Sequence, residues 1–210
     1  MITIDQKKHD SFNQLKKFCE LSTLQEKKLA DFVSLLLSKN QNYNFIGNST
    51  IENIWERHIL DCAQLLKFID NYNLKFADFG SGAGLPGIVL SILGLKEIHL
   101  VEKSFRKCEF LHEAKLLSSN RVFITNSKLE DLDDQSYDCI VSRALAPLPK
   151  LLEYNIKFLK DDGFCLFLKG KNLKSEITES KKNFKFDYEL FPSITSNESN
   201  IIRLNKIIKK

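Results

Sequence analysis

The sequence predicts an α/β fold, in which a mostly parallel, twisted sheet of seven strands is flanked by helices and preceded by a helical N-terminal extension. From residue 74 onward, short apolar runs alternate with segments of helical spacing, which is the pattern of a largely parallel sheet. The first of these runs, 74–79, ends in a glycine-rich turn that leads into an apolar helix, and this opens a nucleotide-type binding unit. Upstream only helical spacing is found. We therefore expect an extension over 1–71 and one core unit over 72–210.

Length and composition exclude several classes. A chain of 210 residues suits one domain with an appendage, and 43% hydrophobic residues are enough for a sizeable core. No run of about 18 apolar residues is present, so no membrane span is expected. The first ten residues are polar and lack a signal core, which favours the cytoplasm. Five widely spaced cysteines without a C-x-x-C pair argue against a zinc site or a disulfide framework.

Positive charge is concentrated at the C-terminal end. The net charge is +4, and residues 150–210 carry thirteen Lys and Arg against eight Asp and Glu. Such a segment can attract a polyanion such as RNA. The chain is rich in Lys and Asn throughout, however, so a merely solvated face is an equal interpretation.

The N-terminal extension is expected to hold three helices. Ser22 and Thr23, followed by Glu26, resemble a capping box that starts the second helix. Residues 40–49 are predicted to form a polar loop with aromatic residues, and Thr50 can cap the third helix. The predicted helices cover about 5–20, 24–38 and 51–69.

The core is expected to alternate strands and helices. The predicted strands cover about 74–79, 97–102, 122–125, 137–142, 164–169, 184–191 and 201–208. The predicted helices cover about 88–95, 104–117 and 147–160, with 171–185 helical or mobile. The last two strands are expected to form a hairpin-like pair, and 126–134 is expected to be a polar turn with a short helix at most.

The glycine turn carries Gly80, Gly82 and Gly84 directly after the first strand. Glycine permits the sharp turn and leaves no Cβ in the way of a ligand. A dinucleotide fingerprint is G-x-G-x-x-G, whereas here the third glycine comes one place early, a spacing typical of S-adenosylmethionine (SAM) methyltransferases. Asp78, just inside the strand, either meets the amino-acid part of the cofactor or supports the turn by hydrogen bonds.

Acidic and apolar residues follow the next two strands, where such a sheet places its ligands. Glu102 ends the second strand and can accept hydrogen bonds from both ribose hydroxyls; the alternative is a surface glutamate paired with Lys103. Leu129 and Glu130 follow the third strand, beside the expected position of the adenine. Leu129 can instead be ordinary core, and Glu130 a solvent-exposed charge.

Arg143 follows the fourth strand, in the stretch 142–147. No Asn/Asp-Pro-Pro-aromatic run is present to hold an exocyclic amine, and Cys139 lies mid-strand, which argues against a pyrimidine-C5 nucleophile. Arg143 stays protonated and can bind a phosphate, a carboxylate or a base edge. On the third helix, Arg57 and Asp61 are four residues apart and can pair along one face, with His58 beside them.

These motifs together resemble one family, the bacterial small-subunit 16S ribosomal RNA guanine-N7 methyltransferases (RsmG, or GidB). The resemblance covers about residues 25–170 and departs from the family pattern at Asn44-Phe45-Ile46, which lacks a hydroxyl, and at Glu102, where Asp is usual. The motifs that carry it are Asn44-Phe-Ile, Arg57-His-Ile-Leu-Asp61, Asp78-Phe-Gly-Ser-Gly-Ala-Gly-Leu-Pro-Gly87, Phe110-Leu111, Lys128-Leu-Glu130, Ser142-Arg-Ala144 and Leu168-Lys-Gly170.

The resemblance implies a Rossmann-like methyltransferase fold, SAM as cofactor, and ribosomal RNA or the small ribosomal subunit as partner. No obligate protein partner is evident in the sequence, and a monomer is expected. It implies SAM binding at five positions: Gly80, Leu85, Leu129, Glu130 and Arg143. To these the strand-end argument adds Asp78, Gly82, Gly84 and Glu102.

The implied target atom needs little acid–base machinery, because guanine N7 has a free lone pair. We expect Arg57, His58, Arg143 and Lys169 to line the RNA side of the site. Three other functions remain open: a small-molecule methyltransferase on the same sheet, a dinucleotide-dependent oxidoreductase, and a non-catalytic RNA-binding module. The short glycine spacing argues against the oxidoreductase, and the intact glycine turn with Glu102 argues against the binding module.

Overall fold

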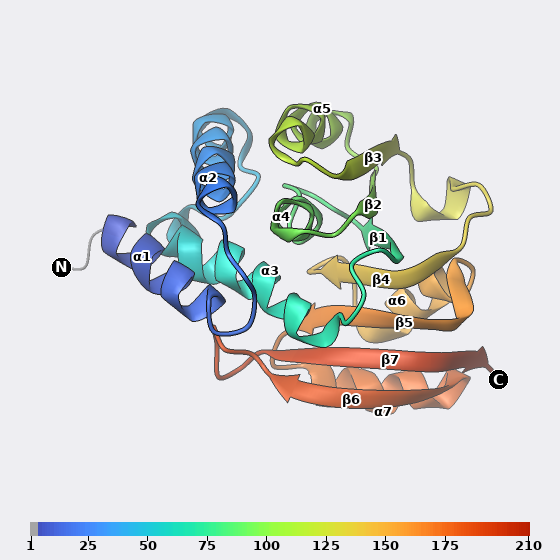
Figure 1. Ribbon diagram of the computed structural model, residues 1–210. Helices are drawn as coiled ribbons and strands as arrows, with labels where there is room; N and C mark the ends of the chain where they lie inside the picture. The colour runs from blue at the N-terminus through green and yellow to red at the C-terminus, as the bar shows by residue number, and fades with distance from the viewer. Residues whose placement is uncertain (1–3) are drawn as a thin grey trace.

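The computed structural model describes residues 4–210, so the first three residues of the predicted extension and of the polar stretch 1–10 lie outside the described part. One sheet of seven strands forms the centre of the molecule, in the order β3-β2-β1-β4-β5-β7-β6 (Figure 1). β1 to β5 are parallel, and β7 runs antiparallel to both β5 and β6. The predicted fold class is confirmed. The strands are β1 (Lys75–Phe79), β2 (Glu97–Glu102), β3 (Arg121–Asn126), β4 (Tyr137–Arg143), β5 (Leu159–Lys169), β6 (Phe184–Pro192) and β7 (Asn200–Lys209).

Helices lie on both faces of this sheet (Figure 1). None of those among residues 4–210 is both long and apolar enough to cross a bilayer. The longer helices are α1 (Ile4–Leu15), α2 (Thr23–Tyr43), α4 (Gly87–Leu93), α5 (Phe105–Ala114), α6 (Leu148–Asn155) and α7 (Leu173–Asn183). The short ones are η1 (Asn48–Asn53), η2 (Trp55–Leu60), α3 (Asp61–Ala63), η3 (Gln64–Phe68), η4 (Lys115–Leu117) and η5 (Leu129–Asp131).

β1 is the strand at which the chain changes direction through the sheet. It pairs with β2 on one side and with β4 on the other. In open α/β sheets, ligands bind beyond the carboxyl ends of the strands that flank this point. The residues that follow β1, β2 and β4 are therefore the ones that the fold brings to one place.

Helix α2 is longer than predicted, and its cap uses a different partner. The capping box joins Ser22 to Gln25 rather than to Glu26, because Gln25 occupies the third helical position. The helix continues to Tyr43, into the predicted loop. It ends where Asn44 adopts a left-handed conformation with φ 49°, and the buried Asn40 accepts a hydrogen bond from the Ile46 N–H through its side-chain oxygen (2.8 Å).

The third predicted helix is an irregular succession of η1, η2, α3 and η3. Trp55–Leu60 is a π-helical turn, in which backbone bonds reach back five residues, and the N–H of Asp61 accordingly bonds to the carbonyl of Glu56. Thr50 does not cap a helix; it lies inside η1, where its hydroxyl donates to the Gly47 carbonyl (2.6 Å). A π-helical turn at this place redirects the side chains that follow it.

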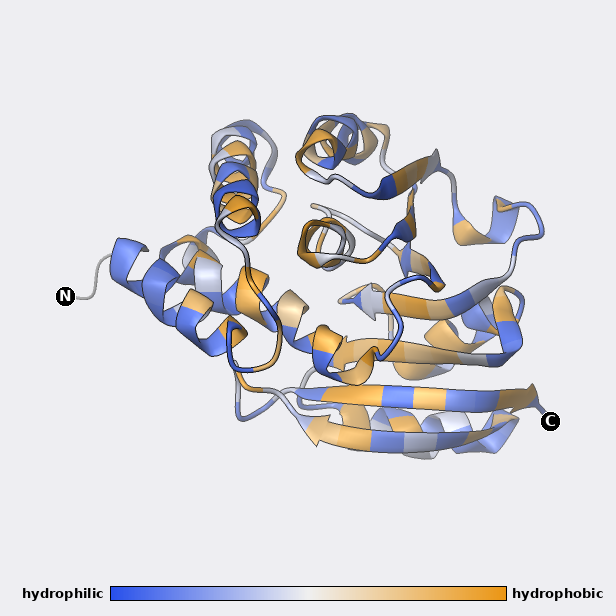
Figure 2. Ribbon diagram, in the orientation of Figure 1, coloured by the Kyte–Doolittle hydropathy of each residue, from blue (hydrophilic) through white to orange (hydrophobic). Residues whose placement is uncertain are grey.

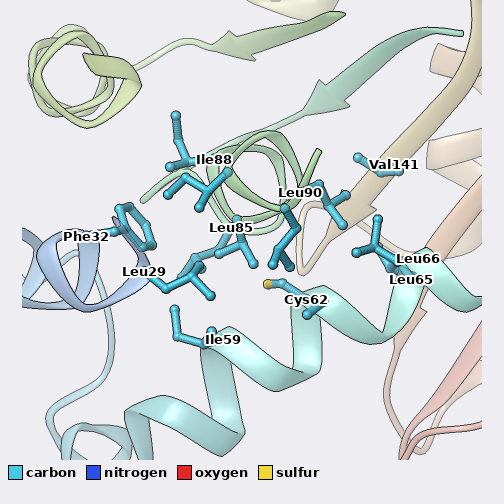
Figure 3. Close-up of a cluster of buried hydrophobic side chains, with 14 of the residues drawn as sticks. Leu29, Phe32, Ile59, Cys62, Leu65, Leu66, Leu85, Ile88, Leu90 and Val141 are labelled. Atoms are coloured by element: carbon cyan, nitrogen blue, oxygen red, sulfur yellow. The ribbon is translucent and has the colours of Figure 1, made fainter. Parts of the chain in front are cut away.

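The extension packs into the main core rather than beside it. α4 is buried along its whole length, and Figure 2 shows it as an almost uniformly hydrophobic helix. Side chains from α2 and from the segment of η2, α3 and η3 surround it (Figure 3): Leu29, Phe32, Ile59, Cys62, Leu65 and Leu66. Burying a side chain of this size contributes about 1.5–3 kcal/mol. The side-chain amide of Gln25 also donates to the last carbonyls of α4, those of Ile92 and Leu93.

Two boundaries differ in the second half of the chain. α6 ends at Asn155, earlier than expected, and β5 begins at Leu159 rather than at 164. The early part of β5 pairs with β4 through Tyr137 and Leu159, and the register then shifts before Cys139. The predicted helix in 171–185 and the late antiparallel pair are confirmed by α7, β6 and β7.

Candidate functional site

Two cavities open at the carboxyl edge of the sheet, and Ala144 lines both. Ala144 directly follows β4 and adopts a left-handed φ of 55°, which is uncommon for a residue other than glycine. We call the first the glycine-turn cavity; it measures about 510 Å³ and is lined by Gly80, Val101, Glu102, Lys103, Lys107, Ser127, Lys128, Leu129, Glu130, Leu145 and Tyr154. We call the second the Arg143 cavity; it measures about 470 Å³ and is lined by Thr50, Arg57, His58, Asp61, Arg143, Leu168, Lys169, Gly170, Lys171, Asn172, Glu176, Thr195, Ser196 and Ser199.

The three glycines of the turn have positive φ angles: 71° at Gly80, 54° at Gly82 and 74° at Gly84. Only Gly80 lines the cavity. A Cβ there would lie 2.5 Å from Leu145 Cδ1, whereas a Cβ on Gly82 would meet only the Gly80 carbonyl, at 3.8 Å. The turn therefore needs glycine for its backbone at all three positions, and Gly80 also needs it for the close approach of Leu145.

Glu102 holds this turn in place. Its carboxylate accepts hydrogen bonds from the N–H of Gly82 (3.0 Å) and from the N–H of Ser104 (2.8 Å). The side chain is buried, yet it lines the glycine-turn cavity. The alternative interpretation of Glu102, a surface glutamate paired with Lys103, does not fit this geometry. An acceptor held in this position by two backbone donors suits a ribose hydroxyl.

Asp78 lies beneath the turn and not in the cavity. It is fully buried, and one oxygen accepts a hydrogen bond from the N–H of Gly87 (2.9 Å), while Oδ1 has no hydrogen-bond partner among the described residues. Burial raises its pKa to about 7, against the smaller opposing effect of the Gly87 bond. Of the two roles considered for Asp78, turn support is the one that this placement favours.

The side chain of Leu85, a residue expected at the cofactor, is buried in the core. Its side chain is 5% exposed and packs among the core residues between α2, α4 and the third helical segment (Figure 3). It lines neither cavity, whereas Leu145, which contacts Gly80, lines the glycine-turn cavity. A contact between Leu85 and a cofactor would therefore have to come from its backbone.

Leu129 and Glu130 line the glycine-turn cavity as a short 3₁₀ turn after β3. Leu129 is buried and offers an apolar wall. Glu130 is exposed and accepts a hydrogen bond from the Tyr154 hydroxyl (2.8 Å), so it is not an isolated surface charge. A hydrogen bond from the backbone of Glu130 itself, followed by the one from the Tyr154 hydroxyl, lowers the pKa of Glu130. Tyr154 lies on α6, and nothing in its local sequence pattern marked it.

Arg143 is held by the third helical segment. Its guanidinium donates to the Arg57 carbonyl (3.0 Å), to Asp61 Oδ2 (3.2 Å) and to His58 Nδ1 (2.8 Å). The predicted pair of Arg57 with Asp61 is wrong: Asp61 pairs with Arg143. The π-helical turn before Asp61 explains this, because it breaks the i, i+4 alignment on which the pairing depended.

Both ring nitrogens of His58 are engaged. Arginine has only donors, so Nδ1 accepts from Arg143, and Nε2 must carry the proton that it donates to Thr50 Oγ1 (2.8 Å). Burial, followed by the charges of Arg143 and Arg57, lowers the pKa of His58 to about 3. This geometry favours a neutral His58 that positions Arg143 over a His58 that transfers protons.

Lys169 lines the Arg143 cavity but is not free to meet RNA. Its ammonium pairs with Glu176 (2.6 Å) and donates to the Ala146 carbonyl (2.9 Å), and its side chain is 9% exposed. Glu176 in turn accepts from the N–H of Leu148 (2.7 Å). Lys169 and Glu176 thus hold the loop after β4. Of the residues expected on the RNA side, Arg57 alone presents an unpaired charged side chain within the described part of the chain.

The loop between β6 and β7 forms a wall of this cavity that sequence reasoning missed. Thr195 Oγ1 donates to Asp61 Oδ1 (2.7 Å), and the amide of Gln64 bonds to Ser193 Oγ (3.0 Å) and to the N–H of Ile194 (2.9 Å). These partners are about 130 residues apart in the chain. No local pattern marks such a contact.

The fold is the Rossmann-like sheet that SAM-dependent methyltransferases have. The structure resembles a ribosomal protein L11 methylase from Lactobacillus delbrueckii subsp. bulgaricus, with a TM-score of 0.59 and 19% identity over 71% of this chain and 78% of the other. It also resembles a TehB-like SAM-dependent methyltransferase from Corynebacterium glutamicum, with a TM-score of 0.58 and 17% identity over 83% and 100% of the two chains.

Sequence comparison narrows the class to one family. Residues 25–203 match the family model described as GidB, rRNA small subunit methyltransferase G, and the chain belongs to this family. A protein of Rickettsia felis named ribosomal RNA small subunit methyltransferase G is 40% identical over 184 residues, 87% of this chain and 94% of the relative. One of the same name from Orientia tsutsugamushi is 40% identical over 177 residues, 84% and 88% of the two chains. The predicted family is confirmed, and the match extends well beyond residue 170.

Proposed function

We propose that the protein transfers a methyl group from SAM to N7 of a guanine in small-subunit (16S) ribosomal RNA. The observation that best supports this proposal is that Ala144 lines both cavities, while the Arg143 cavity holds no free acid–base group. The name shared by the relatives from Rickettsia and Orientia supports ribosomal RNA over a small molecule as the substrate. We further infer that the protein acts as a monomer and in the cytoplasm.

The residues of the glycine-turn cavity fit the parts of SAM. Glu102 presents a carboxylate to the ribose hydroxyls, Leu129 offers an apolar wall for the adenine, and Gly80 lines the cavity where the amino-acid end would lie. When bound there, SAM supplies an electrophilic methyl group on its sulfonium. The protein's task is to hold that group facing the Arg143 cavity, next to Ala144.

The Arg143 cavity suits an acceptor atom that carries no proton. Its three potential bases are all engaged: His58 by Arg143 and Thr50, Asp61 by Arg143 and Thr195, and Glu176 by Lys169. Guanine N7 has an exposed lone pair, so its methylation needs no base. Catalysis then comes from holding N7 in line with the methyl group, for which effective-molarity arguments allow about 7–11 kcal/mol at the limit.

The test is to map N7-methylguanosine in small-subunit ribosomal RNA from cells with and without this protein. The nucleotide should be lost at one position without the protein and should return when the protein is supplied. Incubation with labelled SAM and either ribosomal subunits or a metabolite extract separates the two substrate classes. Label appearing only in the metabolites would contradict the proposal.

Arg57→Ala tests the RNA side directly. Its side chain makes no hydrogen bond or ion pair within residues 4–210, so its loss should weaken RNA methylation while SAM affinity stays unchanged. Lys67→Ala is a control of equal charge on the same segment, outside the cavity. Near-normal methylation by the Arg57 variant would show that Arg57 does not contact the RNA.

A further inference from the structure

The outer wall of the Arg143 cavity is lined by side-chain donors that have no acceptor within residues 4–210. Lys171 and Asn172 come from the β5–α7 loop, and Ser196 and Ser199 come from the β6–β7 loop. Among the described residues, no hydrogen bond engages the Lys171 ammonium, the Asn172 amide or the two serine hydroxyl protons. Ser196 Oγ accepts from the N–H of Glu198 (3.3 Å), which leaves its own proton free to donate.

The charge of this cavity favours an anion. Two carboxylates line it, Asp61 and Glu176, and each is already neutralised by an ion pair, with Arg143 and with Lys169. His58 is neutral, because its pKa is lowered to about 3. Two cations, Arg57 and Lys171, remain without a counter-ion in the described part of the chain. A negatively charged ligand with several acceptor oxygens would pair with these cations and bind the free donors.

The β6–β7 loop is held in place for such a ligand. Thr195 bonds to Asp61, and Gln64, which is 1% exposed, bonds to Ser193 and Ile194. The loop lies beside the helical segment that also positions Arg143 (Figure 1). The hydroxyl-bearing wall is therefore connected to the centre of the site by buried polar contacts, and its donors need little reorganisation to bind.

From this arrangement we propose that Lys171, Asn172, Ser196 and Ser199 form a subsite for a phosphodiester of the RNA, next to the target guanine. The inference rests on the proposed function, since it names the part of the RNA that the outer wall binds. It assigns a role to the C-terminal segment, whose two loops supply all four residues. Phosphate contacts position a nucleic acid without reading its sequence, so the subsite would set the depth and register of the guanine.

The experiment compares charge removal with hydroxyl removal, using small-subunit ribosomal RNA and labelled SAM. Lys171→Ala should raise the KM for RNA about tenfold and reduce the slope of log K against log salt by about 1. The double change Ser196→Ala with Ser199→Ala should raise the KM by a similar factor and leave the salt slope unchanged, because the lost donors are neutral. Lys174→Ala, an exposed lysine outside the cavity, is the matched control and should keep the wild-type KM.

Three results would overturn the inference. If the wild type methylates ribosomal RNA and both variants keep its KM and salt slope, the subsite is wrong while the proposed function stands. If the variants lose SAM affinity instead, measured by calorimetry, the anion held there is the cofactor's carboxylate. If the wild type methylates no ribosomal RNA, the proposed function fails and this inference fails with it.

Discussion

His58 and Asp78 are expected to give the folding stability opposite dependences on pH. His58 has a pKa of about 3 in the folded protein against 6.5 in the unfolded chain, so between these values the unfolded state binds one more proton. Its contribution therefore falls as the pH drops below about 6.5. Asp78 has a folded pKa of about 7 against 3.8, so the folded state binds the extra proton, and its contribution falls as the pH rises from about 4 to 7.

The two effects should nearly offset each other in the wild type. Each amounts to about 1.4 kcal/mol per pH unit inside its window. From pH 4.5 to 6, each group alone would change the free energy of unfolding by about 2 kcal/mol, in opposite directions. Other titrating groups add a background that is common to the wild type and its variants.

Single variants should expose the two slopes. In Asp78→Asn, which keeps an acceptor for the Gly87 N–H, stability should rise with pH relative to the wild type over this range. In His58→Gln it should fall with pH relative to the wild type. The measurement is urea unfolding at four or five pH values. Parallel curves for all three proteins would refute the argument that both groups are buried in their uncharged forms.

Two further predictions concern the glycine-turn cavity. Gly80→Ala should lower the free energy of unfolding by about 2–4 kcal/mol, since a Cβ at 2.5 Å from Leu145 adds overpacking to the cost of a left-handed φ. Gly82→Ala, where the added Cβ has open space, should lower it by only about 1–2 kcal/mol. Equal losses for the two variants in urea unfolding would contradict this. Glu102→Gln leaves one acceptor oxygen for the N–H groups of Gly82 and Ser104, so SAM affinity measured by calorimetry should fall about 10- to 100-fold. A change below twofold would show that Glu102 does not bind the cofactor.

Much of the site's framework was predictable because it depends on local patterns. The bounds of β2 were predicted to the residue, and the glycine turn followed from its spacing after an apolar strand. Gly80, Glu102, Leu129 and Glu130 line one cavity because the carboxyl ends of parallel strands meet at one edge. Even where the partner of the α2 cap was assigned to the wrong residue, the start of the helix was predicted to within one residue, since Ser22 carries that signal.

The partners of the side chains were not predictable in the same way. Asp61 was expected to meet Arg57 and meets Arg143 instead, because a single π-helical turn changes which residues face each other. Leu85 was expected at the cofactor and packs in the core, because α2 and the third helical segment cover that side of the turn. Lys169 was expected to face RNA and is paired with Glu176 from the next helix.

The sequence by itself determined the order of strands and helices along the chain, the position of the glycine turn, and the family. These depend on periodicity, turn chemistry and motif spacing, which are properties of residues close together in the sequence. The tertiary structure alone decided which charges are paired and which are free. It joined Arg143 to His58 and Asp61, and it brought the β6–β7 loop against a segment about 130 residues earlier in the chain. Such contacts depend on how helices pack over the sheet, so no local pattern specifies them.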